Sequence, residues 1–263
     1  MGVKKKRCKK EKGKKCDPYP SEVEVFQPTR HIVTALMQKV VYEEWLPAIL
    51  GKDFVKNNLN LREGTTYNPK VNPSIENGFA TAAFRFGHSM LQGATLNKNH
   101  INDEVKVERI RDNLMNNTNY VAPNGVDDIM YGLTQQPAEK MDAHVTEDVR
   151  NFLFKDPGAA HGQDLVALNI QRGRAHSLAS YLDYRAKFAG NKDDSRRRED
   201  IKRRCLKAPN GITFKEWKSL MEIYNDPEDI DLFTGGLLEA PVKGSILGPT
   251  FHGIIGEYIN QLF

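Results

Sequence analysis

The segment 77-NGFATAAFRFGHSML-91 decides how this chain folds, because it places a single histidine within a run of apolar and small residues. The apolar spacing predicts a helix over residues 76–92, and four of its side chains share one face: Ala80, Phe84, His88 and Leu91. On that face His88 is expected to point into the core, where a neutral imidazole needs at least one hydrogen-bonded nitrogen. From the helix alone, a structural histidine is favoured over a ligand.

Two neighbours of His88 favour the ligand alternative. A cation such as Arg85 beside an inward-facing histidine is suited to an acidic group on a bound cofactor, and Gly87 would let a flat ligand approach the helix closely. The choice between a core histidine and a cofactor ligand therefore depends on the rest of the sequence.

The composition is ordinary for a soluble protein, with 39% hydrophobic and 27% charged residues. The length of 263 residues is sufficient for one large domain or two small ones. No run of about 18 apolar residues occurs, so no membrane-spanning segment is expected. No apolar segment follows the N-terminal lysines, so this chain is expected to carry no secretory signal. Cys8, Cys16 and Cys205 fit neither a disulfide framework nor a zinc site.

Basic residues are concentrated at the N-terminus. Residues 1–16 hold nine of the 38 Lys and Arg residues and one of the 34 acidic residues, so the rest of the chain is mildly acidic. A segment of this kind, here residues 4–15, can bind nucleic acid or anionic lipid through released counterions. No aromatic residue interleaves the lysines, which favours a solvated, disordered basic tail over residues 1–20.

The remaining apolar pattern predicts a mainly α-helical domain over residues 21–263, with long loops and little or no sheet. Besides residues 76–92, helices are expected in six places: residues 28–51, after Gly125, 144–155, 162–190 with an interruption at Gly173, 213–224 behind a Thr213–Glu216 capping box, and 248–263. A loop is expected over residues 52–75, and a short strand at residues 103–110.

The segment FATAAFRFGHSML (79–91) strongly resembles the proximal-ligand helix of the animal haem peroxidases, the family of myeloperoxidase, thyroid peroxidase and peroxidasin. Four further blocks resemble that family in the family's order and cover most of residues 26–257: IVTALMQKVVYEEWLPAILG (32–51), NGVDDIMYGLTQQPAEKMDAHVTEDVRNFLF (124–154), DLVALNIQRGR (164–174) and DLFTGGLLEAPVKGSILGPTFHGIIGE (231–257). The resemblance implies the C-terminal, proximal part of the family's helical domain.

The resemblance also implies roles for four residues. His88 matches the proximal histidine that ligates haem iron, and Asn169 matches the asparagine that accepts a hydrogen bond from that histidine. An acceptor in this position fixes the tautomer of the ligand and tunes its electron donation. Arg85 and Arg172 match arginines near the haem propionates, where guanidinium–carboxylate pairing is well suited. The alternative for each arginine is an ordinary structural salt bridge.

The distal residues of the family are not found in this sequence. In the family, a histidine within a Gly-Gln-Phe-x-Asp-His motif is the acid–base group for peroxide, and an arginine stabilises the departing oxygen. Gln27 and His31 have the spacing of the distal pair, but Arg30 replaces the aspartate, so His31 is expected to be a surface residue. The family's calcium site and its haem-esterifying carboxylates are also expected to be absent, and no catalytic residue is assigned.

The block QRGRAHSLASYLDYR (171–185) departs from the family pattern. Ala175 stands where the family has aspartate, so Arg174 is expected to lose a carboxylate partner. Such changes suggest relaxed constraint on this block or a chain with a different role. The other histidines of the matched region are expected to be structural or ordinary: His161, His176 and His252.

The resemblance implies a haem-binding peroxidase that uses hydrogen peroxide to oxidise a halide or an organic donor, an activity connected with oxidative stress. This chain alone is expected to be weakly active or inactive, because no acid–base group covers the distal face. It is expected to expose apolar surface and to need a distal-half chain or a second copy as partner. The alternative function is that of a non-catalytic homologue acting as a binding protein. An extracellular location is implied by the family alone.

Overall fold

The computed structural model describes residues 21–59, 69–99, 101–116, 118–188 and 211–261. Helices dominate these residues, and the sheet found among them has two antiparallel strands, so the expected mainly α-helical fold with little sheet is confirmed. The basic tail expected over residues 1–20 lies outside the described residues, as do all three cysteines.

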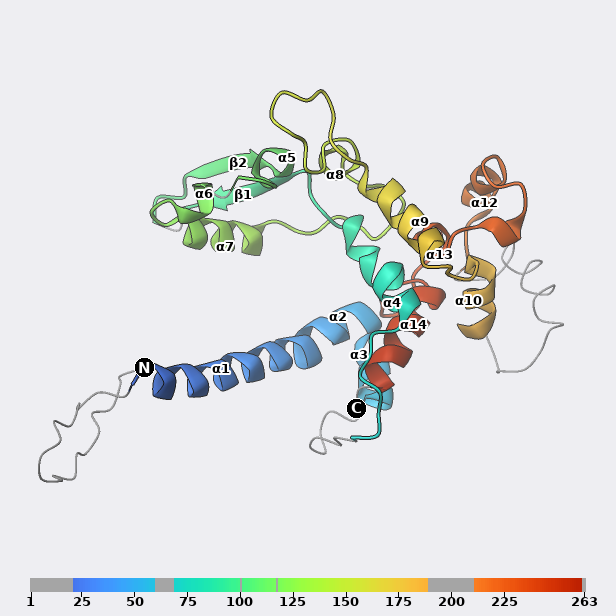
Figure 1. Ribbon diagram of the computed structural model, residues 1–263, viewed down its shortest axis with the longest axis horizontal. Helices are drawn as coiled ribbons and strands as arrows, with labels where there is room; N and C mark the ends of the chain where they lie inside the picture. Colours follow the sequence, from blue (N-terminus) through green and yellow to red (C-terminus); the bar gives the residue numbers. More distant parts are fainter. Residues whose placement is uncertain (1–20, 60–68, 100, 117, 189–210, 262–263) are drawn as a thin grey trace, which may run out of the picture.

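The elements follow one another along the chain as Figure 1 shows. The helical elements of the first half are α1 (Glu22–Lys39), η1 (Val40–Trp45), α2 (Leu46–Leu50), α3 (Lys52–Asn58), α4 (Asn77–Thr81), η2 (Ala83–His88), α5 (Ile110–Asn113), α6 (Thr118–Val121) and α7 (Gly125–Gln135). Those of the second half are α8 (Glu147–Arg150), α9 (Leu165–Ala175), α10 (Tyr181–Phe188), α12 (Phe214–Met221), η3 (Pro227–Asp229), α13 (Leu232–Leu238) and α14 (Pro249–Gln261). The strands are β1 (Ala94–Lys98) and β2 (Val105–Arg109).

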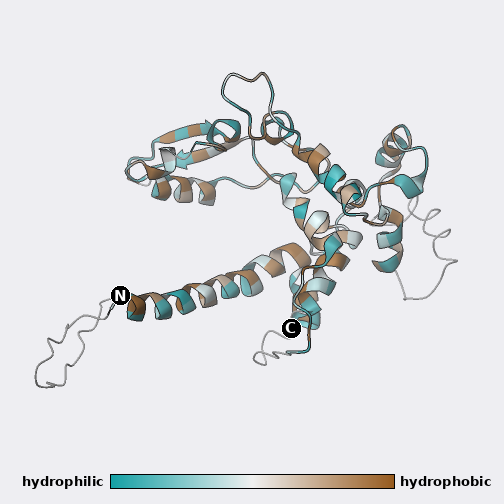
Figure 2. Cartoon of the chain, in the orientation of Figure 1, coloured by the Kyte–Doolittle hydropathy of each residue, from teal (hydrophilic) through white to brown (hydrophobic). Residues whose placement is uncertain are grey.

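The helices α1, η1 and α2 form one continuous arm. Ser21 and Glu24 cap its first turn reciprocally, and Gly51, with a φ of +92°, ends it. The helix expected over residues 28–51 is therefore confirmed and begins earlier, at Glu22. No residue of α1 is buried, and Figures 1 and 2 show α1 projecting from the body with apolar positions along its length. In the described ranges, no helix is long and apolar enough to cross a lipid bilayer.

The short helix α3 occupies residues that were expected to form a loop. Its Val55 is buried in the core, and the Phe54 ring lies 4.5 Å from the ring of His252 in α14. The Phe54 ring docks the segment against α14, and together with the burial of Val55 this contact favours a helix there. The prediction of a loop over residues 52–75 is therefore wrong for Lys52–Asn58.

The segment that carries His88 consists of two short helices. The helix α4 is interrupted at Ala82, whose backbone angles (φ −135°, ψ −68°) are not helical, and the chain continues as the 3₁₀ helix η2. The prediction of one helix over residues 76–92 is wrong, and so is the predicted shared inward face, because Phe84 is 47% exposed. Three residues complete one turn of a 3₁₀ helix, so Arg85 and His88 lie on the same side of η2.

The larger of two hydrophobic clusters packs α2, α3, α4, η2, α13 and α14 together. Leu46, Phe251 and Ile255 are fully buried within it, and Gly236 lies so close to Phe251 that a Cβ there would overlap the ring. A smaller cluster packs α10 against α12 around the buried Tyr181. The helix α9 packs on the larger cluster through partly buried residues, which places it beside α4 and α13.

The strands β1 and β2 form a hairpin that packs on α7. Their antiparallel register sets Ala94 opposite Arg109. Gly132 of α7 lies against the backbone of Leu96, where no Cβ would fit. Because β2 lies within residues 103–110, the predicted strand is confirmed. Figure 1 shows this group apart from the central helices, on the same side as the α1 arm.

A buried carboxylate ties the hairpin to α8. Asp148 is inaccessible to solvent and forms ion pairs with Arg109 and Arg111, the latter at 3.0 Å. The backbone N–H of Arg111 donates to the same carboxylate at 3.2 Å. Burial alone would raise the pKa of Asp148, but these donors outweigh it and hold the pKa below its ordinary value.

Candidate functional site

Three side chains from two elements form a hydrogen-bonded chain at His88. Asn169, the buried residue of α9, has its Nδ2 2.9 Å from Nδ1 of His88. Arg85 donates from Nη1 to Oδ1 of Asn169 at 2.8 Å, and its Nε donates to the carbonyl oxygen of Ala80 at 3.1 Å. The structure therefore brings together three of the four residues that were expected to form the site, and Arg172 lies near them on α9.

The environment of His88 favours its neutral form. Burial, followed by the nearby charge of Arg85, lowers the pKa of His88 below its ordinary value. A neutral imidazole is the form that binds metals. In the part of the chain that the structure describes, Nε2 of His88 has no hydrogen-bond partner. One ring nitrogen is thus engaged, and the other has no hydrogen-bond partner among these residues.

Arg85 and Arg172 are neighbouring cations. Burial, followed by the charge of Arg172, lowers the pKa of Arg85 from its ordinary value. Among the residues described, neither arginine forms an ion pair with an acidic side chain. The structural salt bridge that was the alternative for each arginine is therefore not seen within these residues. Two adjacent guanidinium groups without a counter-charge are suited to a ligand with two carboxylates.

His88 is suited to bind a metal ion whose other ligands come from a cofactor and not from the protein. Groups of three or more His, Cys, Asp or Glu side chains able to hold a metal ion do not occur among the described residues. A metal ion bound by protein alone usually takes about three or four side-chain ligands, whereas haem iron takes one axial histidine. A Cβ at Gly87 would meet no atom within 4 Å, so there is open space beside His88. These residues fit a haem bound through His88.

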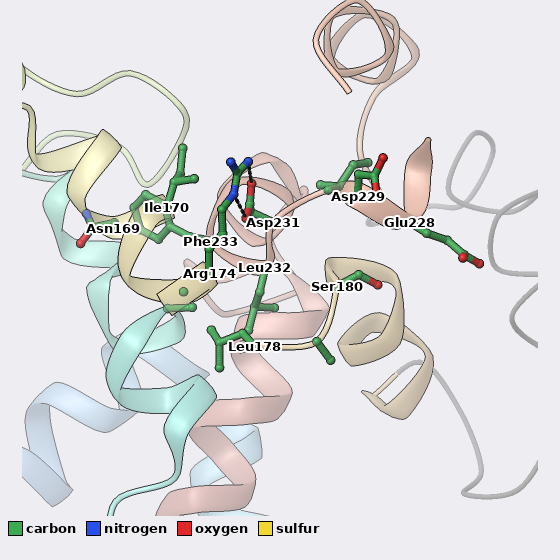
Figure 3. Close-up of a pocket in the computed structure, with 14 residues that line it drawn as sticks. Asn169, Ile170, Arg174, Leu178, Ser180, Glu228, Asp229, Asp231, Leu232 and Phe233 are labelled. Carbon is green, nitrogen blue, oxygen red and sulfur yellow. Dashed lines mark hydrogen bonds and ion pairs between the residues drawn. The ribbon is translucent and has the colours of Figure 1, made fainter. Parts of the chain in front are cut away.

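A separate small cavity adjoins Asn169. Its volume is about 140 Å³, and Figure 3 shows it between α9, the turn after α9 and the segment that leads into α13. Ligand pockets usually have volumes of about 300–1,000 Å³, and His88 does not line this cavity. The cavity is therefore not the place for a group the size of haem.

One wall of this cavity is an ion pair, drawn with dashed lines in Figure 3. Arg174 donates from Nε and Nη2 to the carboxylate of Asp231 at 3.0 and 2.7 Å, which raises the pKa of Arg174 above its ordinary value. The expectation that Arg174 loses its carboxylate partner because of Ala175 is wrong, since Asp231 supplies one. Asp231 lies 57 residues further along the chain, so no local sequence pattern indicated this pair.

Four other histidines have structural or surface positions, as expected. His176 contacts the side chain of Asn77 at 3.0 Å, and Nε2 of His252 donates to the carbonyl oxygen of Leu50 at 2.9 Å. The side chains of two histidines are exposed, His31 on α1 and His161 before α9. None of these four residues joins the cluster around Asn169.

The contact between Arg85 and Asn169 was not anticipated from the sequence. The sequence indicated a role for each residue toward a cofactor, but not toward one another. Arg85 and Asn169 are 84 residues apart, so no local pattern indicated their contact. The Arg-x-x-His spacing, in contrast, places Arg85 and His88 on one side of an α-helix or of the 3₁₀ helix that is found.

Comparisons with known proteins identify the relatives of this chain. The family described as animal haem peroxidase matches residues 13–263. The chain is 34% identical over 250 residues to chorion peroxidase of Drosophila melanogaster, and 33% identical over 246 residues to thyroid peroxidase of Rattus norvegicus. Its structure is similar to that of peroxidase A from Dictyostelium discoideum, with a TM-score of 0.70 and 29% sequence identity.

These matches cover nearly all of this chain but only part of each relative. They include 92% and 90% of this chain for the two curated relatives, and 29% and 25% of those proteins. The structural match includes 93% of this chain and 44% of the Dictyostelium chain. Because the family match extends over almost the whole sequence, the chain belongs to the animal haem peroxidase family.

Proposed function

We propose that this chain binds haem and that His88 is the axial ligand of the haem iron. Family membership supports a peroxidase-type function. The observation that carries the proposal is the His88 ring, which has Nδ1 engaged by Asn169 and Nε2 without a partner among the described residues. Haem, when bound, would supply the redox chemistry by which hydrogen peroxide oxidises a halide or an organic donor.

The side chains around His88 would bind and orient the haem. With haem bound, the amide oxygen of Asn169 would accept a hydrogen bond from Nδ1–H of His88 and so hold the imidazole in one orientation and in its ligating tautomer. Arg85 and Arg172 would pair with the two propionates, because a planar guanidinium matches a carboxylate in geometry and charge. Each of these is a binding or positioning role, and no catalytic residue is proposed for this chain.

We also propose that this chain alone turns over peroxide weakly or not at all. Its sequence has no match to the distal histidine motif, and proton transfer by a positioned group contributes roughly 10²–10⁴-fold in rate. The relatives extend well beyond the matched region, so a distal segment is proposed as the missing part of the catalytic site.

Both proposals are tested on the purified 263-residue chain mixed with hemin. We expect a protein-dependent Soret band, and a rate of donor oxidation by hydrogen peroxide close to that of free hemin. A titration without any protein-dependent band would contradict haem binding. A rate far above that of free hemin, abolished by His88→Ala, would contradict the proposal of weak turnover.

The exposed apolar side chains of the α1 arm support the proposal that this part of the domain binds a partner. Eight large apolar side chains of the arm are more than 40% exposed: Val23, Val25, Phe26, Ile32, Val33, Leu36, Met37 and Val40. Apolar surface of this extent marks an interaction site. A distal-half chain or segment is proposed to cover it, with a second copy of this chain as the alternative. Binding of nucleic acid or anionic membrane through residues 4–15 is not proposed.

A non-catalytic binding protein is the second candidate function, and the exposed face of α1 favours it. A chain that associates through α1 but gives no Soret band dependent on His88 would support this candidate. An extracellular location, a role in oxidative stress and a single domain over residues 21–263 are proposed from family membership alone.

A further inference from the structure

We propose that Arg85 is a positioning residue that acts through Asn169 to hold His88 with its proton on Nε2, and that an anion must draw Arg85 away before His88 can ligate iron. This inference rests on the proposed haem function. It concerns one step of it, namely how Nε2 of His88 loses its proton so that its lone pair can bind iron.

The first step is the orientation of the Asn169 amide. A guanidinium group has only donors, so the amide atom that faces Arg85 must be the carbonyl oxygen. The contact between Arg85 Nη1 and Asn169 Oδ1, at 2.8 Å, has this form, and the guanidinium is also fixed by its bond to the carbonyl oxygen of Ala80. The NH₂ group of the amide therefore faces His88.

The second step is the position of the imidazole proton. An amide NH₂ group can only donate, so Nδ1 of His88, 2.9 Å away, must be the acceptor. A neutral imidazole carries one proton, which is then on Nε2. The nitrogen without a protein partner thus has no free lone pair, and iron needs that lone pair. Held in this way, His88 is not in its ligating form.

The third step is what the ligating form requires. With iron on Nε2, the proton resides on Nδ1 and needs an acceptor, which Asn169 provides if its amide turns by about 180°. The proton on Nε2 leaves to solvent and another from solvent binds Nδ1, so the net charge of the ring is unchanged. The turned amide presents its NH₂ group to Arg85, where donor would face donor. Arg85 must therefore leave Asn169.

The surroundings of Arg85 indicate what would draw it away. Arg85 has no acidic partner among the described residues, and the charge of Arg172 is close enough to lower its pKa. An anion with two carboxylates would bind both guanidinium groups and compete with the neutral amide for Arg85. Binding of the anion to the two arginines would then favour the ligating tautomer of His88, and the two events would be coupled in the way that allosteric sites are.

The proton position can be measured without haem, by ¹⁵N NMR of the full chain labelled in histidine, because the two ring nitrogens differ in shift according to which is protonated. We expect Nε2–H in the wild-type chain. In Asn169→Asp, an isosteric carboxylate accepts from both neighbours, and the proton should move to Nδ1. Arg85→Leu should give a mixture of tautomers. Arg172→Leu, the control for loss of a nearby charge, should leave Nε2–H, and circular dichroism checks that each variant is folded.

A second measurement compares hemin with its dimethyl ester, which has no carboxylates. We expect the wild-type chain to bind the ester more weakly than hemin. Arg85→Leu should bind the ester about tenfold more tightly than the wild type does, which corresponds to about 1.4 kcal/mol. A simple salt bridge between Arg85 and a propionate predicts no change in affinity for the ester.

An Nδ1–H tautomer in the haem-free wild type would overturn the proposal, and so would an ester affinity unaffected by Arg85→Leu. Failure of the haem proposal has a different signature. Hemin would then give no Soret band with any variant, while the tautomer of the haem-free chain would still decide whether Arg85 holds Asn169 and His88 as proposed.

Discussion

The helices α1 and α14 carry similar apolar patterns but differ completely in burial. In α14, Phe251 and Ile255 are fully buried in the larger cluster. In α1, apolar residues recur at helical spacing, yet none is buried, and Leu36 is 57% exposed. The comparison teaches that the spacing of apolar residues identifies a face, whereas burial depends on which segment packs against it.

The largest effect is expected from a matched pair of truncations in these two helices. Phe251→Ala removes a fully buried ring from the core and should lower the free energy of unfolding by about 4 kcal/mol. Leu36→Ala removes exposed apolar surface and should change it by less than about 0.5 kcal/mol. Urea unfolding of the isolated chain, followed by circular dichroism, measures both. Equal losses would mean that α1 packs against the body in solution.

A smaller loss of stability is expected when the ion pairs between the β1–β2 hairpin and α8 are broken. Asp148→Asn leaves Arg109 and Arg111 without their carboxylate and should lower the free energy of unfolding by about 2 kcal/mol. Both arginines are partly exposed, which keeps the loss below that of a fully buried pair. The exposed Asp112, changed to Asn, is the control and should have little effect.

The stability that the Asp148 carboxylate contributes is expected to depend on pH. Because the pKa of Asp148 is lower in the folded chain than its ordinary value of 3.8, its contribution is fully present above that value. The contribution is lost as the pH falls through the lowered pKa. The difference in stability between the wild type and Asp148→Asn should therefore be constant near neutral pH and narrow in acid. A difference that persists unchanged in acid would contradict the proposed ion pairs.

A substitution on the exposed face of α1 is expected to have the smallest effect on stability but a clear effect on self-association. Leu36→Lys places a charge within that face and should reduce self-association of the isolated chain, measured by sedimentation velocity at increasing concentration. Gln38→Lys adds the same charge at an exposed polar position of the same helix and should not reduce it. If both variants sediment like the wild type, the exposed face of α1 does not mediate self-association, and a second copy of this chain is not its partner.

The sequence predicted those elements whose signals are local. The arm, the strand within residues 103–110 and the capping box of Thr213 with Glu216 all follow from spacing or from cap residues. The break at Ala82 was missed because neither glycine nor proline marks it. The helix α3 was missed because its stability comes from contact with α14.

The site was predictable from the sequence only in part. Apolar periodicity indicated an inward-facing His88 for the wrong reason, since the helix it assumed is interrupted. Asn169 lies 81 residues away from His88, and only the family resemblance linked the two. The partner of Arg174 is set by the fold, which brings Asp231 to the end of α9. Long-range polar contacts of this kind leave no periodic pattern in a sequence.

The most direct test of the central claim is whether His88 itself ligates haem iron. Hemin is titrated into three full-length chains: the wild type, His88→Ala and, as a control with the same change at an exposed position, His31→Ala. We expect the Soret band of the wild type and of His31→Ala to be the same, His88→Ala to lose it, and added imidazole to restore it by supplying the missing ligand. A spectrum unchanged by His88→Ala would contradict the claim.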